Sequence, residues 1–210
     1  EIDHLCELGI SVVQFDEPVL TEVIFSHHQT RSFMCAALSE KQDFVAELQF
    51  AKSLITQIFE YARNKNIKTA LHVCRGNWSK DESVLLRGPY TSLVDLFESA
   101  LPDILMLEFS TPRAGELSSL LEGKILRQKC ILGLGVINPR SDEVETVDQI
   151  VQRAEKALNY LPPEQIWLNP DCGFATFSNR PLNGFDIIET KLKVLNEAKS
   201  ILRERYVSRT

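Results

Sequence analysis

The sequence has no long apolar run. None of its apolar stretches approaches the roughly 18 consecutive residues of a membrane-spanning helix. Residues 1–4 also lack the basic-then-apolar pattern of a secretory signal. We therefore expect no membrane contact and a cytoplasmic location.

A long basic run is missing as well, and the formal net charge is -6. Proteins that bind nucleic acids neutralise backbone phosphates with clustered Lys and Arg, which this chain does not offer. We expect no nucleic-acid partner and look instead for a small-molecule site.

The cysteines do not form a disulfide framework. There are five of them, an odd number, and they lie far apart in segments that look like helices or strands. A small secreted domain would carry an even number at close spacing in loop-rich sequence. This usage favours a reducing compartment.

Glycine is sparse, with nine residues in 210. Gly133 and Gly135 stand two apart, but the remaining glycine of the dinucleotide fingerprint is absent. A nucleotide cofactor is therefore not expected. There is no internal repeat or low-complexity segment, and 44% of the residues are hydrophobic, so we expect a single domain over residues 1–210.

Short aliphatic runs alternate with helical patterns along the chain. A capping box, Ser39-Glu-Lys-Gln42, opens the clearest helix. The predicted strands are 12–15, 69–73, 104–108, 131–135 and 166–169. The predicted helices are 39–64, 91–101, 116–128, 144–160 and 185–205.

This alternation predicts an α/β fold whose parallel sheet is covered by helices. A closed barrel and an open doubly wound sheet both remain allowed. The barrel is favoured because polar residues capable of binding a metal follow three different strands, and barrel active sites are assembled at that end from several strands.

Those residues are His72 and Cys74 on one strand, Glu108 at the end of the next, and Cys172 in the turn Asn169-Pro-Asp-Cys-Gly173. Residues two apart in a strand point to the same face, so His72 and Cys74 can hold one ion together. Two thiolates, an imidazole and a carboxylate suit Zn²⁺. The sequence therefore predicts a zinc site made by these four residues.

A second interpretation of these four residues requires no metal. Free cysteines often act as small apolar fillers of a core, and a lone glutamate at a strand end often only pairs with an arginine. Spacing alone leaves both interpretations open.

With the motifs assembled, the chain resembles the cobalamin-independent methionine synthase family, in particular its catalytic C-terminal barrel and the shorter relatives whose zinc strand reads His-x-Cys-Arg-Gly-Asn. Five motifs occur in the family's order. They are the Asp-Glu-Pro strand end within 14–18, the zinc strand at 71–78, the Glu strand at 105–109, the Gly-rich strand at 133–140 and the final Asn-Pro-Asp-Cys-Gly turn within 167–174.

The resemblance implies a (β/α)8 TIM-type barrel of which this chain holds about the last five βα units, matching strands 4 to 8. A second chain or a missing N-terminal segment would complete it. It also implies one Zn²⁺ on His72, Cys74, Glu108 and Cys172, and methyl transfer from a methylfolate-type donor to the thiol of homocysteine. Glu108 would be the ligand that an incoming sulfur displaces, and Asp16 would bind the substrate's ammonium group.

The chain departs from the family in one loop. The synthases place a histidine after the Gly-rich strand to protonate the leaving nitrogen, whereas residues 136–140 read Val-Ile-Asn-Pro-Arg. We therefore assign no catalytic residue beyond the zinc site. Two alternatives stay open: alkyl transfer to another thiol such as coenzyme M, and a non-catalytic assembly domain with structural zinc. Asn77 and Asp171 are expected only to support the site.

Overall fold

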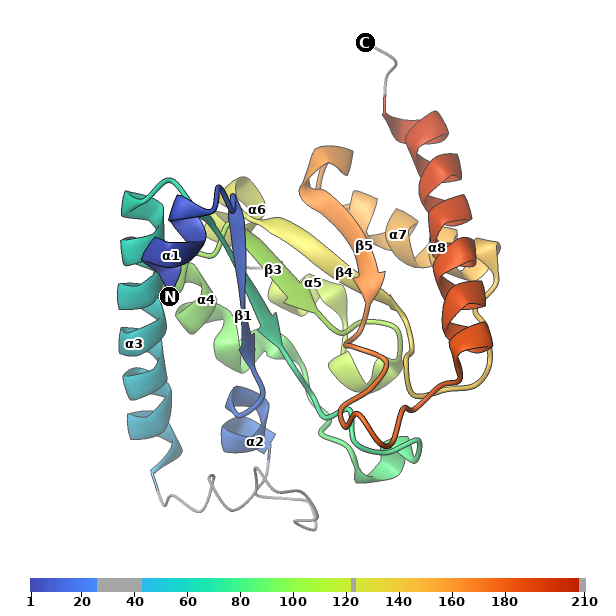
Figure 1. Ribbon diagram of the computed structural model, residues 1–210, viewed down its shortest axis with the longest axis horizontal. Helices are drawn as coiled ribbons and strands as arrows, with labels where there is room; N and C mark the ends of the chain where they lie inside the picture. The colour runs from blue at the N-terminus through green and yellow to red at the C-terminus, as the bar shows by residue number, and fades with distance from the viewer. Residues whose placement is uncertain (26–42, 122–123, 208–210) are drawn as a thin grey trace.

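The computed structural model describes residues 1–25, 43–121 and 124–207. Its sheet has five strands in the order β1-β2-β3-β4-β5, and every neighbouring pair is parallel (Figure 1). The strands are β1 (Val12–Glu17), β2 (Lys68–Val73), β3 (Ile104–Leu107), β4 (Ile131–Ile137) and β5 (Ile166–Pro170). Each strand falls on one of the predicted apolar runs.

Helices connect the strands. The α-helices are α1 (Ile2–Glu7), α2 (Leu20–Phe25), α3 (Phe44–Asn64), α4 (Val94–Ala100), α5 (Leu117–Leu120), α6 (Lys124–Lys129), α7 (Val147–Leu158) and α8 (Phe185–Tyr206). Short 3-10 helices are η3 (Glu82–Val84), η4 (Tyr90–Leu93), η5 (Pro112–Ala114) and η6 (Pro163–Gln165). None of the described helices has the length and apolar character needed to cross a bilayer.

Two predicted helices differ in detail. The predicted capping box at Ser39 lies outside the described residues, and α3 begins after Asp43, whose carboxylate accepts hydrogen bonds from the N–H groups of Val45 and Ala46. The single helix predicted over 116–128 was wrong, because α5 ends at Leu120 and α6 begins at Lys124. Leu121 closes α5 in a turn, and residues 122–123 lie outside the described part of the chain.

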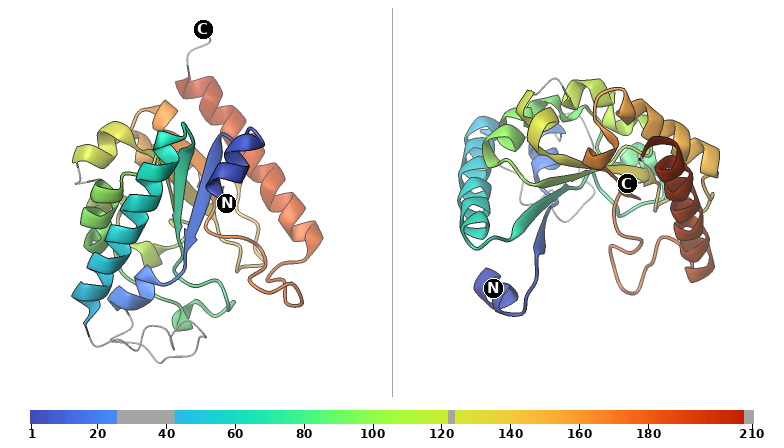
Figure 2. Two further views of the ribbon diagram at one scale, coloured as in Figure 1. Left: turned by 60° about the vertical axis from the view of Figure 1, so that its left-hand side comes forward. Right: turned by 90° about the horizontal axis from the view of Figure 1, so that it is seen from above.

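The strand order identifies the type of sheet. Each strand lies beside its predecessor, and the helices α3 to α8 form an outer layer along one face, as the view from above shows (Figure 2). A doubly wound sheet would reverse its strand order and carry helices on both faces. Five consecutive strands with a one-sided helix layer are what a segment of a (β/α)8 barrel presents, which agrees with the predicted fold class.

The two faces of the sheet differ in chemistry. The face that packs against the helices, here called the helix face, is aliphatic and carries the core: Phe15, Leu71, Val73, Leu105, Leu107, Leu132, Leu134, Val136 and Leu168. The opposite, open face carries one row of residues in register: Asp16, His72, Met106, Gly133 and Trp167. Residues paired across parallel strands point the same way, so the polar side chains gather on the open face.

A buried lysine fixes the loop between β4 and α7. Lys191 of α8 is fully buried, and its Nζ donates hydrogen bonds to the Asn138 carbonyl at 3.1 Å and the Glu145 carboxylate at 3.0 Å. Glu145 in turn accepts the N–H of Asn138 at 2.7 Å. The loop 138–145 is therefore held against α8 by charge as well as by packing.

Replacing this lysine tests the tie between helix and loop. Lys191→Met would leave the buried Glu145 carboxylate without its cation, so we expect the free energy of unfolding to fall by about 3 to 5 kcal/mol. Lys193→Met on the same helix removes an exposed partner of Glu189 and is the matched control, with an expected change below about 0.5 kcal/mol. Urea denaturation measures both, and equal losses would contradict the role given to Lys191.

Candidate metal centre

The ends of β2, β3 and β5 bring the four predicted ligand residues together. His72 lies on β2, Cys74 directly after it, Glu108 directly after β3, and Cys172 in the loop after β5. One ligand atom from each lies within 4.8 Å of all the others. His72 and Glu108 are buried, and the two cysteines are partly buried.

The His72 imidazole is oriented for a metal. Its Nδ1 lies 3.1 Å from the Met106 carbonyl, so Nδ1–H donates there and the lone pair belongs to Nε2. Nε2 is buried and has no hydrogen-bond partner among the described residues. A histidine anchored through one nitrogen, with the other unpartnered, is the usual arrangement of a metal ligand.

The turn after β2 shapes the surroundings of Cys74. Gly76 donates its N–H to the Cys74 sulfur at 3.3 Å. It adopts a φ of 95°, and a Cβ at this position would come within 2.3 Å of the Trp78 ring. Only glycine fits here without strain. The glycine thereby lets the turn bring a backbone N–H to the Cys74 sulfur.

The loop that carries Cys172 is tied to the same turn. The Asn77 side-chain amide donates to the Gly173 carbonyl at 2.6 Å, and the Thr176 hydroxyl donates to the Asn77 carbonyl. Asn77 is thus the bridge between the cysteine after β2 and the cysteine after β5. Asn77 therefore supports the site without being one of the four predicted ligand residues.

Asp171 links the ends of β3 and β5. One of its oxygens accepts the N–H groups of Phe109 at 3.1 Å and Ser110 at 2.9 Å, directly after Glu108. It reaches them across β4 at Gly135, where a Cβ would lie 2.4 Å from the Asp171 carboxylate. The glycine therefore permits a close approach that fixes Glu108 relative to Cys172.

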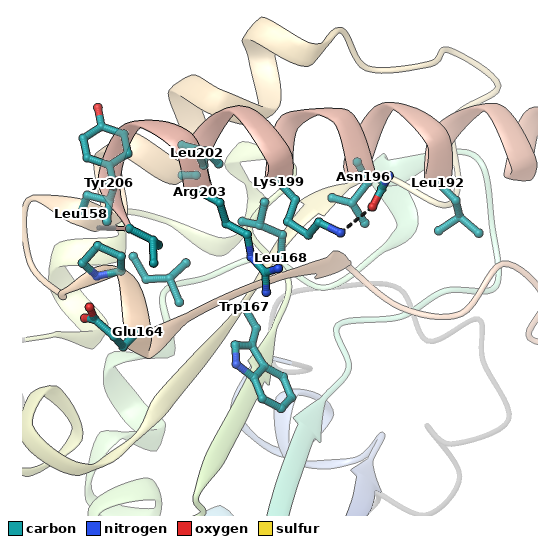
Figure 3. A pocket seen from close by; sticks show the side chains of 15 residues that line it. Leu158, Glu164, Trp167, Leu168, Leu192, Asn196, Lys199, Leu202, Arg203 and Tyr206 are labelled. Carbon is teal, nitrogen blue, oxygen red and sulfur yellow. Dashed lines mark hydrogen bonds between the residues drawn. The ribbon is translucent and has the colours of Figure 1, made fainter. Parts of the chain in front are cut away.

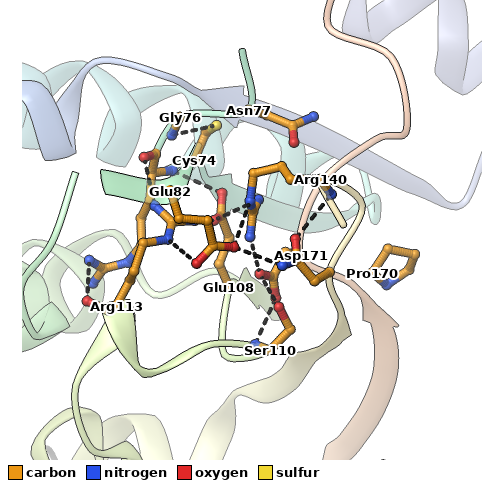
Figure 4. Close-up of polar contacts among 12 residues, drawn as sticks. Cys74, Gly76, Asn77, Glu82, Glu108, Ser110, Arg113, Arg140, Pro170 and Asp171 are labelled. Atoms are coloured by element: carbon orange, nitrogen blue, oxygen red, sulfur yellow. Dashed lines mark hydrogen bonds and ion pairs between the residues drawn. The ribbon is translucent and has the colours of Figure 1, made fainter. Parts of the chain in front are cut away.

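Glu108 is held by three arginines that were not predicted as site residues. Its Oε1 accepts the backbone N–H of Arg75 at 2.9 Å, and its Oε2 lies 3.2 Å from Nη2 of Arg113 and 3.5 Å from Nη1 of Arg140 (Figure 4). The Arg75 guanidinium stacks 3.9 Å from the centre of the Tyr90 ring. The sequence feature that could have indicated their role is that all three arginines follow predicted strands.

Burial and mutual contact shift the pKa values of the cluster. For His72 burial is the largest single effect and lowers the pKa, but Cys74 and Glu108 together outweigh it and raise the pKa to about 9. Contact with Cys172, followed by burial, raises the pKa of Cys74, and the same contact lowers the pKa of Cys172. Burial, followed by repulsion from Asp171, raises the pKa of Glu108. A metal binds the deprotonated groups and so releases protons from this cluster.

The donor set fits a zinc ion. Two sulfurs, one free imidazole nitrogen and one carboxylate are ligands that Zn²⁺ takes in tetrahedral sites. Cys130 shows what a filler cysteine looks like in this fold: it packs in the apolar core, and burial raises its thiol pKa to about 12. Cys74 and Cys172 lie instead beside each other and beside the side chains of His72 and Glu108.

Asp16, the predicted substrate-binding residue, lies on β1 and is paired in register with His72. Its side chain is exposed on the open face and accepts a hydrogen bond from the Gln14 amide at 2.7 Å. The structure therefore puts this carboxylate on the strand next to the metal cluster, where an outside molecule can reach it.

Residues 1–183 match the family described as cobalamin-independent synthase, catalytic domain. Among relatives, a 5-methyltetrahydropteroyltriglutamate–homocysteine methyltransferase of Herpetosiphon aurantiacus is 43% identical over 84% of this chain and 20% of its own length. A methionine synthase of Saccharolobus solfataricus is 26% identical over 97% of this chain and 48% of its own length.

A solved structure shares the fold. The B12-independent methionine synthase of Shewanella sp. W3-18-1, in complex with selenomethionine, superposes with a TM-score of 0.66 at 19% identity, over 97% of this chain and 51% of that one. The chain thus spans about half or less of the length of these relatives. With most of its length matching the family's catalytic domain and its fold shared, the chain belongs to the cobalamin-independent synthase family.

Proposed function

We propose that this chain carries the zinc-binding part of a methyltransferase that moves a methyl group from a methylfolate-type donor to the thiol of homocysteine, forming methionine. The observation that carries the proposal is the convergence of His72, Cys74, Glu108 and Cys172 within 4.8 Å on the open face of the sheet. The names of the matched relatives supply the reaction and its two substrates.

The four residues would hold the ion, with Cys74 and Cys172 as permanent anionic ligands and His72 bound through Nε2. Zinc, when bound, keeps a substrate thiol as thiolate at neutral pH, where a free thiol is mostly protonated. Glu108 would be the ligand that yields its position, because a carboxylate gives way to sulfur more readily than a thiolate does. In the overall reaction the thiol loses its proton, the methyl–nitrogen bond breaks, a methyl–sulfur bond forms, and the leaving nitrogen takes up a proton.

The loop after β4 has no histidine to supply that last proton. Arg140 lies near the start of this loop and is fully buried among carboxylates. A guanidinium does not give up a proton in proteins. We therefore propose that the general acid belongs to another segment of the assembled protein.

Asp16 would select the thiol substrate. Its carboxylate faces the open side of the sheet beside His72 and is positioned to pair with the ammonium group of an amino-acid thiol. Coenzyme M carries a sulfonate and no ammonium group, so an exposed carboxylate at this position favours homocysteine over the alternative thiol.

We also propose that further strands complete the barrel, supplied by a second chain or by an N-terminal segment. β1 and β5 each pair with a neighbour on one side within the described sheet. On the open face, 45% of the Trp167 side chain is exposed. Between β5 and α8 lies a groove of about 670 Å³, into which Leu168 and Leu192 point while Trp167 turns away (Figure 3). Exposed strand edges and apolar grooves of this kind are normally covered.

The predicted metal ligands can be tested by cysteine replacement. Cys74→Ser and Cys172→Ser each remove a thiolate, so we expect zinc content to fall from about one ion per chain to near zero. Cys6→Ser on the surface helix α1 is the matched control and should retain zinc. Metal analysis of the native, assembled protein after dialysis against a chelator gives the answer, and full zinc in Cys172→Ser would refute the assignment.

Thiol binding separates a catalytic from a structural zinc site. In the cobalt-substituted protein, homocysteine should replace an oxygen ligand by sulfur and add a sulfur-to-cobalt absorption band, because the carboxylate yields its position. A closed structural site predicts an unchanged spectrum.

Asp16→Ala should leave metal content intact and weaken homocysteine binding by about tenfold, the effect of losing one ion pair in a partly buried site. Binding of a thiol without an ammonium group, such as 3-mercaptopropionate, should not change. Asp95→Ala, which removes an exposed carboxylate on α4, is the control. Equal loss of both thiols in Asp16→Ala would contradict the role of this carboxylate in ammonium recognition.

The completed barrel can be tested on the protein from its native source. Intact-mass analysis together with sedimentation should find either a longer chain or a complex with a second chain, because the edges of β1 and β5 require partners. A monomer with the mass of these 210 residues alone and a stable fold would contradict the proposal.

A further inference from the structure

A buried cluster of ion pairs lies directly behind the metal ligands. Three carboxylates meet two guanidinium groups there: Glu82, Glu108 and Asp171 pair with Arg113 and Arg140. Four of these five residues are buried, and Glu82 is half-buried. Arg75 contributes its backbone N–H to Glu108, not its guanidinium. The negative charge of Glu108 is therefore paired with cations without a metal ion.

Glu108 uses both carboxylate oxygens within this cluster. The backbone N–H of Arg75 occupies Oε1 at 2.9 Å, and Arg113 occupies Oε2 at 3.2 Å. Arg113 is itself fixed, since its Nη1 donates to the carbonyls of Arg75 and Leu86. Glu108 thus differs from the cysteines, because strong cationic partners compete with a metal for its oxygens.

One N–H donor group of the Arg140 side chain makes no hydrogen bond within the described residues. Its Nη2 donates to Asp171 at 2.7 Å, and its Nε lies 3.4 Å from Glu82. Its Nη1 is buried, has no hydrogen-bond partner among the described residues, and lies 3.5 Å from Oε2 of Glu108 (Figure 4). A small turn of the Glu108 side chain would complete this bond and satisfy an otherwise costly buried donor.

We propose that Arg113 and Arg140 form a seat that receives the Glu108 carboxylate when a substrate thiol takes its place on the metal. The inference rests on the proposed function. In the exchange, the carboxylate oxygen would leave the ion for the guanidinium donors, and the thiol would give its proton to solvent and bond to the ion through sulfur. Both arginines act through Glu108 and are positioning residues.

The seat lowers the cost of the exchange. A carboxylate that left the ion with no cation nearby would be an unpaired buried charge, which costs several kcal/mol. The arginines remove that penalty and also weaken Glu108 as a ligand. Their loss should therefore strengthen metal binding and weaken thiol binding. A purely structural role predicts that both affinities fall together.

The experiment uses the cobalt-loaded protein in its native assembly. Metal affinity is measured by chelator competition, and thiol affinity by titrating homocysteine against the sulfur-to-cobalt absorption band. Arg140→Gln should weaken homocysteine binding by about tenfold and leave metal affinity unchanged or higher. Arg140→Lys should show the same pattern more weakly, since it keeps the charge, and it carries the test if Arg140→Gln does not fold.

The matched control is Lys80→Met. Lys80 pairs with Asp142 at 2.6 Å on the surface. This pair joins the connections after β2 and β4, which the pair of Glu82 and Arg140 also joins. In Lys80→Met, the metal affinity and the homocysteine affinity should equal those of the unsubstituted protein. A second comparison places Arg140→Lys in a Glu108→Gln background, where the effect on thiol binding should disappear, because a neutral side chain needs no cationic seat.

The outcomes separate the two proposals. If the parent protein binds cobalt but no thiol, the proposed function fails and the seat fails with it. If the parent binds thiol and the Arg140 variants bind it equally well, the seat alone is overturned. A parallel fall of metal and thiol affinity in both variants would also overturn it, and would leave Arg140 as a scaffold residue.

Discussion

The carboxylate of Asp171 makes the contacts on which the position of Glu108 depends. From the loop after β5 it accepts the backbone N–H groups directly after Glu108, and it pairs with Arg140 of the loop after β4. Three strand ends are thereby fixed in a buried region. Each buried charge loses its hydration and is stabilised only by its ionic partners. Removing one member of the cluster therefore destabilises the others. The site is therefore a property of the whole cluster.

The strand register determines which side chains reach this cluster. One row runs across the sheet from Asp16 through His72 to Met106, and the alternate row turns its aliphatic residues to the helices. A shift of one residue in any pairing would bury the histidine in the core and expose a leucine. Core packing and ligand geometry are consequently set by the same register, so the apolar face enforces the position of the polar one.

Much of this was predictable, for identifiable reasons. Buried parallel strands appear in sequence as short aliphatic runs, and the confirmed strand positions and barrel type follow from them. The break between α5 and α6 was missed because the apolar residues on both sides of it continue at helical spacing. The arginines were missed for another reason: an arginine in a loop usually carries a solvated charge, and no local pattern distinguishes Arg140, which is fully buried. The tertiary fold decides its burial.

Five strands of a barrel are enough to hold all four proposed metal ligands. His72, Cys74, Glu108 and Cys172 all come from β2, β3 and β5, so the described strands position every proposed ligand without help from elsewhere. The loop after β4 contributes no histidine, and its Arg140 is permanently charged and engaged with carboxylates. The reaction would then be divided in space: activation of the thiol belongs to these strands, while the donor and its proton source approach from the side on which the sheet is open. A division of this kind requires that the added segment close over the open face, where the row from Asp16 to Trp167 runs through His72 from one edge strand to the other.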